Sequence, residues 1–84
     1  MCTYLTEIVP MSGSAKAGKG WFKFSESSVY FDHPVHALLG HSLNIDFRNP
    51  DLGPGARVAV ELSKDGARNL ALAILRTLDA AGDL

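Results

Sequence analysis

The chain has 84 residues, which is enough for one domain spanning residues 1–84 with a single small core. Its formal net charge is −1, and its lysines and arginines are scattered, so no basic stripe is present to bind nucleic acid. No apolar run is long enough to span a membrane, and no signal-peptide pattern opens the chain. Packing alone gives a chain of this size roughly 3–5 kcal/mol of net stability, so we expect self-association or a bound ligand to supplement it.

Cys2 is the only cysteine, which excludes an intrachain disulfide and is typical of a reducing compartment. We therefore predict a cytoplasmic protein. Removal of Met1 would place the thiol beside a free amine, as in some nucleophilic enzymes. No oxyanion-hole sequence accompanies Cys2, so we interpret it as a small residue at the start of a strand.

Residues 1–32 predict three short strands and one loop. β-Branched and aromatic residues dominate the first segment, which stops at Pro10. The segment after Pro10 has three glycines and no hydrophobic period, which favours a loop. The predicted elements are a strand at residues 3–9, a loop at 11–20, a strand at 21–25, a turn or bulge at 26–28 and a strand at 29–32.

Residues 41–62 predict two further strands. Apolar and polar side chains alternate strictly between residues 41 and 48, and turn-forming residues fill 49–55. A last strand is predicted at residues 56–62. The inward-facing residues are His41, Leu43, Ile45 and Phe47 on one strand and Ala56, Val58, Val60 and Leu62 on the next.

Ser63 is a good helix N-cap, and the helix predicted after it runs to about Ala80. Its apolar residues recur at three- and four-residue spacing, so one stripe is expected to lie on a sheet, with Leu70 and Ile74 buried. Leu72 falls outside the stripe among polar residues and hints at a second buried surface. The stripe consists of Ala67, Leu70, Ala71, Ile74, Leu75 and Leu78.

This order of elements predicts an α+β fold: an antiparallel sheet of about five strands followed by one C-terminal helix packed on one face. The other face of the sheet has no predicted cover. Trp21 and other aromatic residues are expected to line it, so we predict a homodimer that buries sheet against sheet.

All three histidines, His33, His36 and His41, lie within nine residues that link two predicted strands. Imidazole changes charge near neutral pH and binds divalent metals when neutral, so this cluster is the main candidate for chemistry. It is compatible with a three-histidine site for a metal such as zinc, with an acid–base pair, or with hydrogen-bonded caps at the edge of the core. The spacing is not a specific zinc signature, and we favour the structural interpretation without a metal.

Strand register sharpens the expectation for these histidines. Antiparallel pairing that sets His33 opposite His41 also sets Phe31 opposite Leu43, so apolar residues meet on one face. The same register places Val29 opposite Ile45. Asp46 would then point to the other face, away from any shared metal.

Residues 13–20 nearly match the phosphate-binding pattern G-x-x-x-x-G-K-[ST]. Gly20 stands where the magnesium-binding hydroxyl should be, and the residues from Trp21 onward form a strand pattern and not a helix. We therefore interpret this segment as a loop and expect no nucleotide site.

The chain resembles, over nearly its whole length, a family of short actinobacterial proteins classed only as a domain of unknown function. The segments that carry the resemblance are Met1-Cys2-Thr3, Gly20-Trp21-Phe22, Val29-Tyr30-Phe31-Asp32-His33-Pro34, Leu43-Asn44-Ile45-Asp46-Phe47 and Ala56-Arg57-Val58-Ala59-Val60-Glu61-Leu62. The resemblance implies a complete chain from a bacterial cytosol, and it carries no catalytic assignment. Some short proteins of this kind occur among natural-product biosynthesis genes, which suits an accessory role.

Three classes of function remain: a homodimer that binds a small ligand or a protein partner, a metal-binding protein or small metalloenzyme that uses His33, His36 and His41, and a metal-free acid–base enzyme. We favour the first, because the sequence shows no positioned nucleophile or carboxylate pair. Whether the protein is an enzyme stays open at this point.

Overall fold

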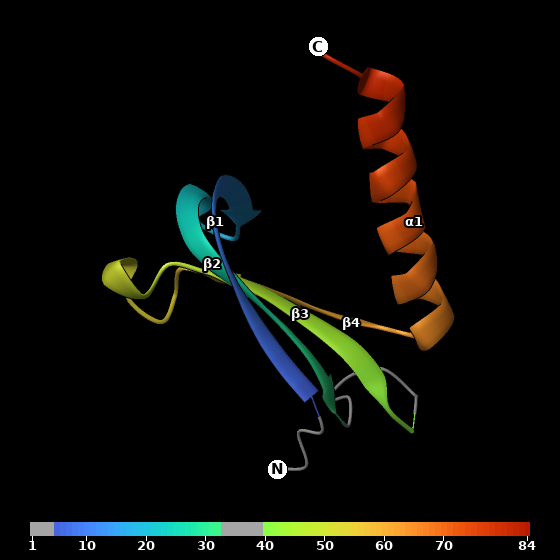
Figure 1. The fold of residues 1–84 in the computed structure, drawn as a ribbon. Coiled ribbons are helices and arrows are strands. Elements are labelled where there is room, and N and C mark those ends of the chain that lie inside the picture. The colour runs from blue at the N-terminus through green and yellow to red at the C-terminus, as the bar shows by residue number, and fades with distance from the viewer. Residues whose placement is uncertain (1–4, 33–39) are drawn as a thin grey trace.

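A computed structural model gives the fold of the chain and describes residues 5–32 and 40–84. Four strands form one antiparallel sheet in the order β1-β2-β3-β4, and one C-terminal helix follows them. Figure 1 shows a strongly twisted sheet with α1 rising from the end of β4. The α+β class is therefore confirmed, with four strands where the sequence predicts about five.

Strands β1 (Leu5–Ala17) and β2 (Gly20–Asp32) form one long hairpin joined at Gly18-Lys19. The predicted loop at residues 11–20 is wrong, and so is the predicted turn or bulge at 26–28, which lies within the continuous strand β2. The hairpin tip lacks apolar alternation because it projects from the sheet, and Pro10 is tolerated because β1 is an edge strand. The hairpin has its irregular pairing in β1 instead, where the register shifts between Pro10 and Gly13.

Gly13 lies where β1 passes against the ring of Phe24. A Cβ atom at Gly13 would sit 2.5 Å from Cζ of Phe24, so only glycine fits without a shift of the ring. Phe24 in turn packs against Phe47, with the two ring centroids 5.1 Å apart. This contact joins the outer part of the hairpin to the apolar side of the sheet.

Strands β3 (Ser42–Arg48) and β4 (Arg57–Leu62) confirm the last two predicted strands to within one residue at each end. A short 3₁₀ helix, η1 (Pro50–Leu52), lies in the connection between them. Asn49 caps η1 by accepting a hydrogen bond from the amide of Asp51 at 3.0 Å. Its side-chain amide also donates to the carbonyl of Lys23 at 2.9 Å, which ties this turn to the hairpin.

Helix α1 (Lys64–Ala81) begins where the sequence predicts, with the Ser63 hydroxyl accepting from the amide of Gly66 at 3.0 Å. The prediction that Leu70 and Ile74 are buried on the sheet is wrong for the single chain: they are 45% and 51% exposed. Only Ser63 separates β4 from α1, so no loop allows the helix to fold down along the strands. Figure 1 shows α1 standing away from the sheet.

The described part of the single chain has almost no enclosed core. Across residues 5–32 and 40–84, Ala56 is the one hydrophobic residue that is buried. The chain exposes 6379 Å² of surface, whereas a compact monomer of its mass of 9.0 kDa exposes about 4,900 Å². Its radius of gyration is 14.1 Å, against about 12 Å for a compact domain of this length.

We predict that Gly13→Ala destabilises the protein by about 1 kcal/mol or more, because the added methyl group must displace the Phe24 ring. Gly18→Ala is the matched control, since nothing lies within 4 Å of the position of its Cβ. Urea unfolding followed by circular dichroism measures both variants. Equal losses at the two glycines would contradict the close packing at Gly13.

Candidate functional site

Strand alternation divides the sheet into an apolar face and a polar face. Leu43, Ile45 and Phe47 share the apolar face, as the sequence predicts, and their neighbours on β2 and β4 continue it across the sheet. The other members of this face are Val29, Phe31, Val58, Val60 and Leu62.

Burial on β3 is the reverse of what this alternation predicts. Ser42, Asn44 and Asp46 on the polar face are buried, whereas Leu43 and Ile45 on the apolar face are only half-buried. A soluble sheet normally buries its apolar side against the core. In the single chain it is the apolar face that lacks a complete cover.

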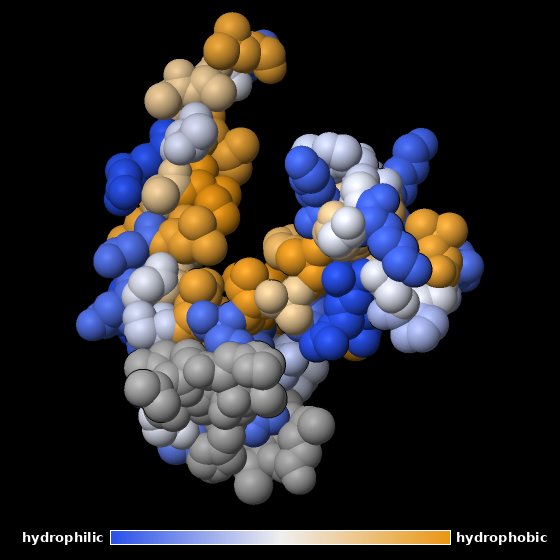
Figure 2. Space-filling model, turned by 180° about the vertical axis from the view of Figure 1, so that it is seen from behind, coloured by the Kyte–Doolittle hydropathy of each residue, from blue (hydrophilic) through white to orange (hydrophobic). Residues whose placement is uncertain are grey.

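A hollow of about 730 Å³ lies between α1 and the apolar face. Figure 2 shows it as a concave, largely hydrophobic surface bounded by the helix on one side and by the hairpin on the other. The first half of α1 forms one wall, and β2 and β3 supply the floor. The apolar lining residues are Val29, Phe31, Leu43, Ile45, Ala67, Leu70, Ala71 and Ile74.

Charged side chains lie at the margins of this hollow. Lys64 places its ammonium 5.2 Å from the ring centroid of Phe31, at cation–π distance. Arg68 pairs with Asp65 at 3.3 Å in an exposed ion pair that contributes little stability. Among the lining residues that the structure describes, Glu7 is the one carboxylate, and there is no cysteine, serine or histidine. The lining has the chemistry of a binding surface.

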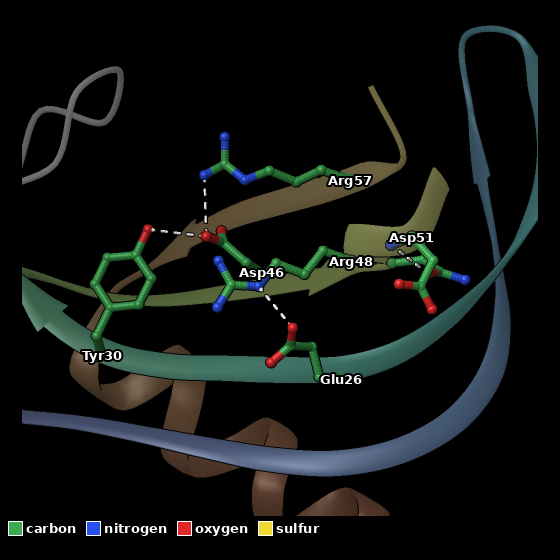
Figure 3. A network of polar contacts seen from close by, with 7 residues as sticks. Glu26, Tyr30, Asp46, Arg48, Asp51 and Arg57 are labelled. Atoms are coloured by element: carbon green, nitrogen blue, oxygen red, sulfur yellow. Dashed lines mark hydrogen bonds and ion pairs between the residues drawn. The ribbon is translucent and has the colours of Figure 1, made fainter. Parts of the chain in front are cut away.

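The polar face is held by a network around Asp46. One carboxylate oxygen of Asp46 accepts hydrogen bonds from the Tyr30 hydroxyl at 3.3 Å and from Nη2 of Arg57 at 3.0 Å (Figure 3). The Asp46 side chain is 8% exposed and that of Arg57 is 50% exposed. The hydrogen bond to Asp46 raises the pKa of Arg57 above its usual range, so the guanidinium stays charged at every working pH.

A second pair extends this network along the sheet. Arg48 lies opposite Arg57 on the neighbouring strand, and the Arg48 guanidinium is 3.5 Å from Glu26 (Figure 3). Each arginine therefore has its own carboxylate, which offsets the repulsion between two cations placed side by side. The Arg48–Glu26 contact is an ion pair without a hydrogen bond: in the described part of the chain, Nε of Arg48, the Ser28 hydroxyl and the second oxygen of Asp46 are buried without a hydrogen-bond partner.

The expectation that aromatic residues line the face away from the helix holds for Tyr30 but is wrong for Phe31 and Phe47. Phe31 and Phe47 lie on the helix side, and the far face carries the charged network. Trp21 lies in the hairpin and is 71% exposed. Sequence reasoning missed the charged network around Asp46. The signal was available in the strand register, since the register that pairs Val29 with Ile45 also sets Tyr30, Asp46 and Arg57 on one face.

Two of the three candidate metal ligands, His33 and His36, lie outside the described residues. His41 is described, is exposed, and stacks on the Phe31 ring with centroids 5.5 Å apart. The predicted pairing of Phe31 with Leu43 is confirmed, and it ends at Asp32 opposite Ser42. Within residues 5–32 and 40–84 there is no group of three metal-ligating side chains.

Asp46 points to the polar face, away from Leu43, as the register predicts. It is therefore no ligand for a metal on the other face. The proximity of His33 and His41 themselves stays a prediction.

The match to known proteins covers almost the whole chain. Residues 1–83 match the model of a family of unknown function, DUF6295. The chain belongs to this family. No curated protein and no solved structure matches it. In the part of the chain that the structure describes, no helix is long and apolar enough to cross a membrane.

We predict that Asp46→Ala costs about 1–3 kcal/mol of stability, because Tyr30 and Arg57 lose their common acceptor. Asp79→Ala, on the exposed surface of α1, is the control and should change stability by less than about 0.5 kcal/mol. The free energy of unfolding in urea tests both. A loss at Asp46 no larger than at Asp79 would show that the network adds nothing.

Proposed function

We propose that the protein is a non-enzymatic, homodimeric binding protein with an accessory role, which binds a ligand or a protein partner. The observation that carries this proposal is the hollow of about 730 Å³ between α1 and the sheet. Its volume falls within the range of about 300–1,000 Å³ typical of ligand sites, and its lining is mainly apolar. Such a surface recognises nonpolar groups by burial and offers little for acid–base or nucleophilic chemistry.

Surface area supports the dimer. The single chain exposes roughly 1,500 Å² more than a compact monomer of its mass, taking 6379 Å² less about 4,900 Å². The exposed residues include Leu70, Ile74, Leu75 and Leu78 of α1, and clustered exposed apolar side chains mark an interaction surface in a soluble protein. Association of two copies would remove much of it from water.

We extend the proposal to the setting of the protein. The single cysteine supports a cytoplasmic location, and the net charge of −1 supports a partner other than nucleic acid or a membrane.

The solution mass tests the proposed dimer. Multi-angle light scattering should give twice 9.0 kDa at micromolar concentrations. A mass of one chain across the whole micromolar range would overturn the proposal. Full-length protein without an affinity tag is the sample, so that added histidines cannot contribute to binding or association.

A metal-binding protein or small metalloenzyme is the second candidate, with His33, His36 and His41 as ligands. The confirmed pairing of Phe31 with Leu43 supports it, because the predicted pair of His33 and His41 belongs to the same register. Zinc bound by three histidines and an open fourth position could activate water.

Metal analysis of the untagged protein tests this second candidate. If it is right, the protein contains about one metal ion per chain, and His36→Ala lowers the metal content with little change in unfolding free energy. Metal-free protein that stays metal-free after incubation with zinc would eliminate the site.

A further inference from the structure

We propose that the hollow is filled by helix α1 of a second copy, with each copy placing its α1 against the apolar sheet face of the other. This inference rests on the proposed homodimer and names the surface through which it forms. The arrangement is isologous, since the same helix and the same sheet face are used on both sides.

The width of the sheet leaves room for a second helix. Four strands spaced about 4.8 Å apart span about 14 Å between the outer strands, and packed helices lie about 10 Å apart. A sheet of this width therefore takes two helices side by side. The chain's own α1 rises from the β4 edge and stands away from the strands. The hollow extends from α1 across β3 and β2 to Glu7 of β1.

The helix itself is apolar over more of its surface than one sheet contact uses. Leu70 and Ile74 face the hollow, but Leu75 and Leu78 lie beyond its lining and are 58% and 63% exposed. The apolar stripe of α1, from Leu70 to Leu75 around the helix, covers an arc of about 140°, whereas a helix lying on one face typically uses about 100°. The surplus arc fits contact with a second helix.

The exposed area also matches a second copy better than a small molecule. The single chain exposes roughly 1,500 Å² more total surface than a compact monomer of its mass, and removal of that excess from both copies would give an interface of about 3,000 Å², within the range of obligate homodimers. A small molecule that fills the hollow would leave Leu75 and Leu78 in water, because they lie outside it. A helix inserted from a second copy can cover both.

Isotope-filtered nuclear Overhauser spectroscopy on the unmodified protein is the direct test. In a dimer mixed from labelled and unlabelled copies, only contacts between copies give signals. We expect signals from the methyl groups of Leu75 and Leu78 to the other copy's sheet face, at Val29 and Ile45, or to its α1. A dimer whose contacts between copies avoid both α1 and the apolar face would overturn this inference and leave the proposed dimer standing. A monomer would overturn both.

Paired variants on one helical turn give a second test. Leu78→Glu should weaken the dimer at least about 100-fold, since a buried leucine is lost from both copies. Arg76→Glu lies on the opposite side of α1 and should leave the dissociation constant within a few-fold of the native value. Sedimentation equilibrium measures both.

Equal effects of the two substitutions on association would overturn the inference. If Leu78→Glu does not fold, the contacts observed in the native dimer decide the question. If the native protein instead binds an apolar dye such as anilinonaphthalene sulfonate in the hollow while remaining a dimer, a small molecule and not α1 is the occupant.

Discussion

In the single chain, the sheet buries its polar face and leaves its apolar face partly exposed. The rest of the structure depends on this reversal. Asp46 and its neighbours on the polar face are buried and paired, while Leu43 and Ile45 on the apolar face open into a hollow. A polar face whose arginines lie beside carboxylates can remain next to water at little cost, but an apolar face of this size cannot. The constraint on the whole molecule is therefore a cover for the apolar face, and α1 alone provides only part of it.

The charged network and the hollow complement each other. Asp46 binds Tyr30 and Arg57 across three strands, which fixes the alignment of β2, β3 and β4 without any contribution from the apolar side. A sheet held in this way can present its opposite face as a preformed binding surface. In the proposed dimer, this face and α1 meet their counterparts with little rearrangement of the strands, which lowers the entropic cost of association.

Much of the fold follows from local sequence patterns. The strict alternation in β3, the cap at Ser63 and the length of α1 are local properties, and all three are confirmed. The pairing of Phe31 with Leu43 also followed from alternation, because a slip by one residue would move every apolar side chain to the wrong face.

The remaining features depend on contacts between distant residues. The long hairpin was missed because Gly13 and Phe24 are eleven residues apart, and the loop-like composition between them gave no sign of their contact. The open position of α1 was missed because helical spacing predicts an apolar stripe but not the partner that covers it. The histidines stay a hypothesis, since His33 and His36 lie outside the described residues.

The most direct test of the central claim is the concentration dependence of stability. If the apolar face must be covered by a second copy, unfolding is coupled to dissociation, and the urea midpoint rises with protein concentration. Measured from about 1 to 100 μM, the midpoint should increase steadily, by an amount equivalent to about 2.7 kcal/mol of dimer stability over that hundredfold range. A midpoint that does not change with concentration would show that one copy is stable with its apolar face uncovered, and would contradict the claim.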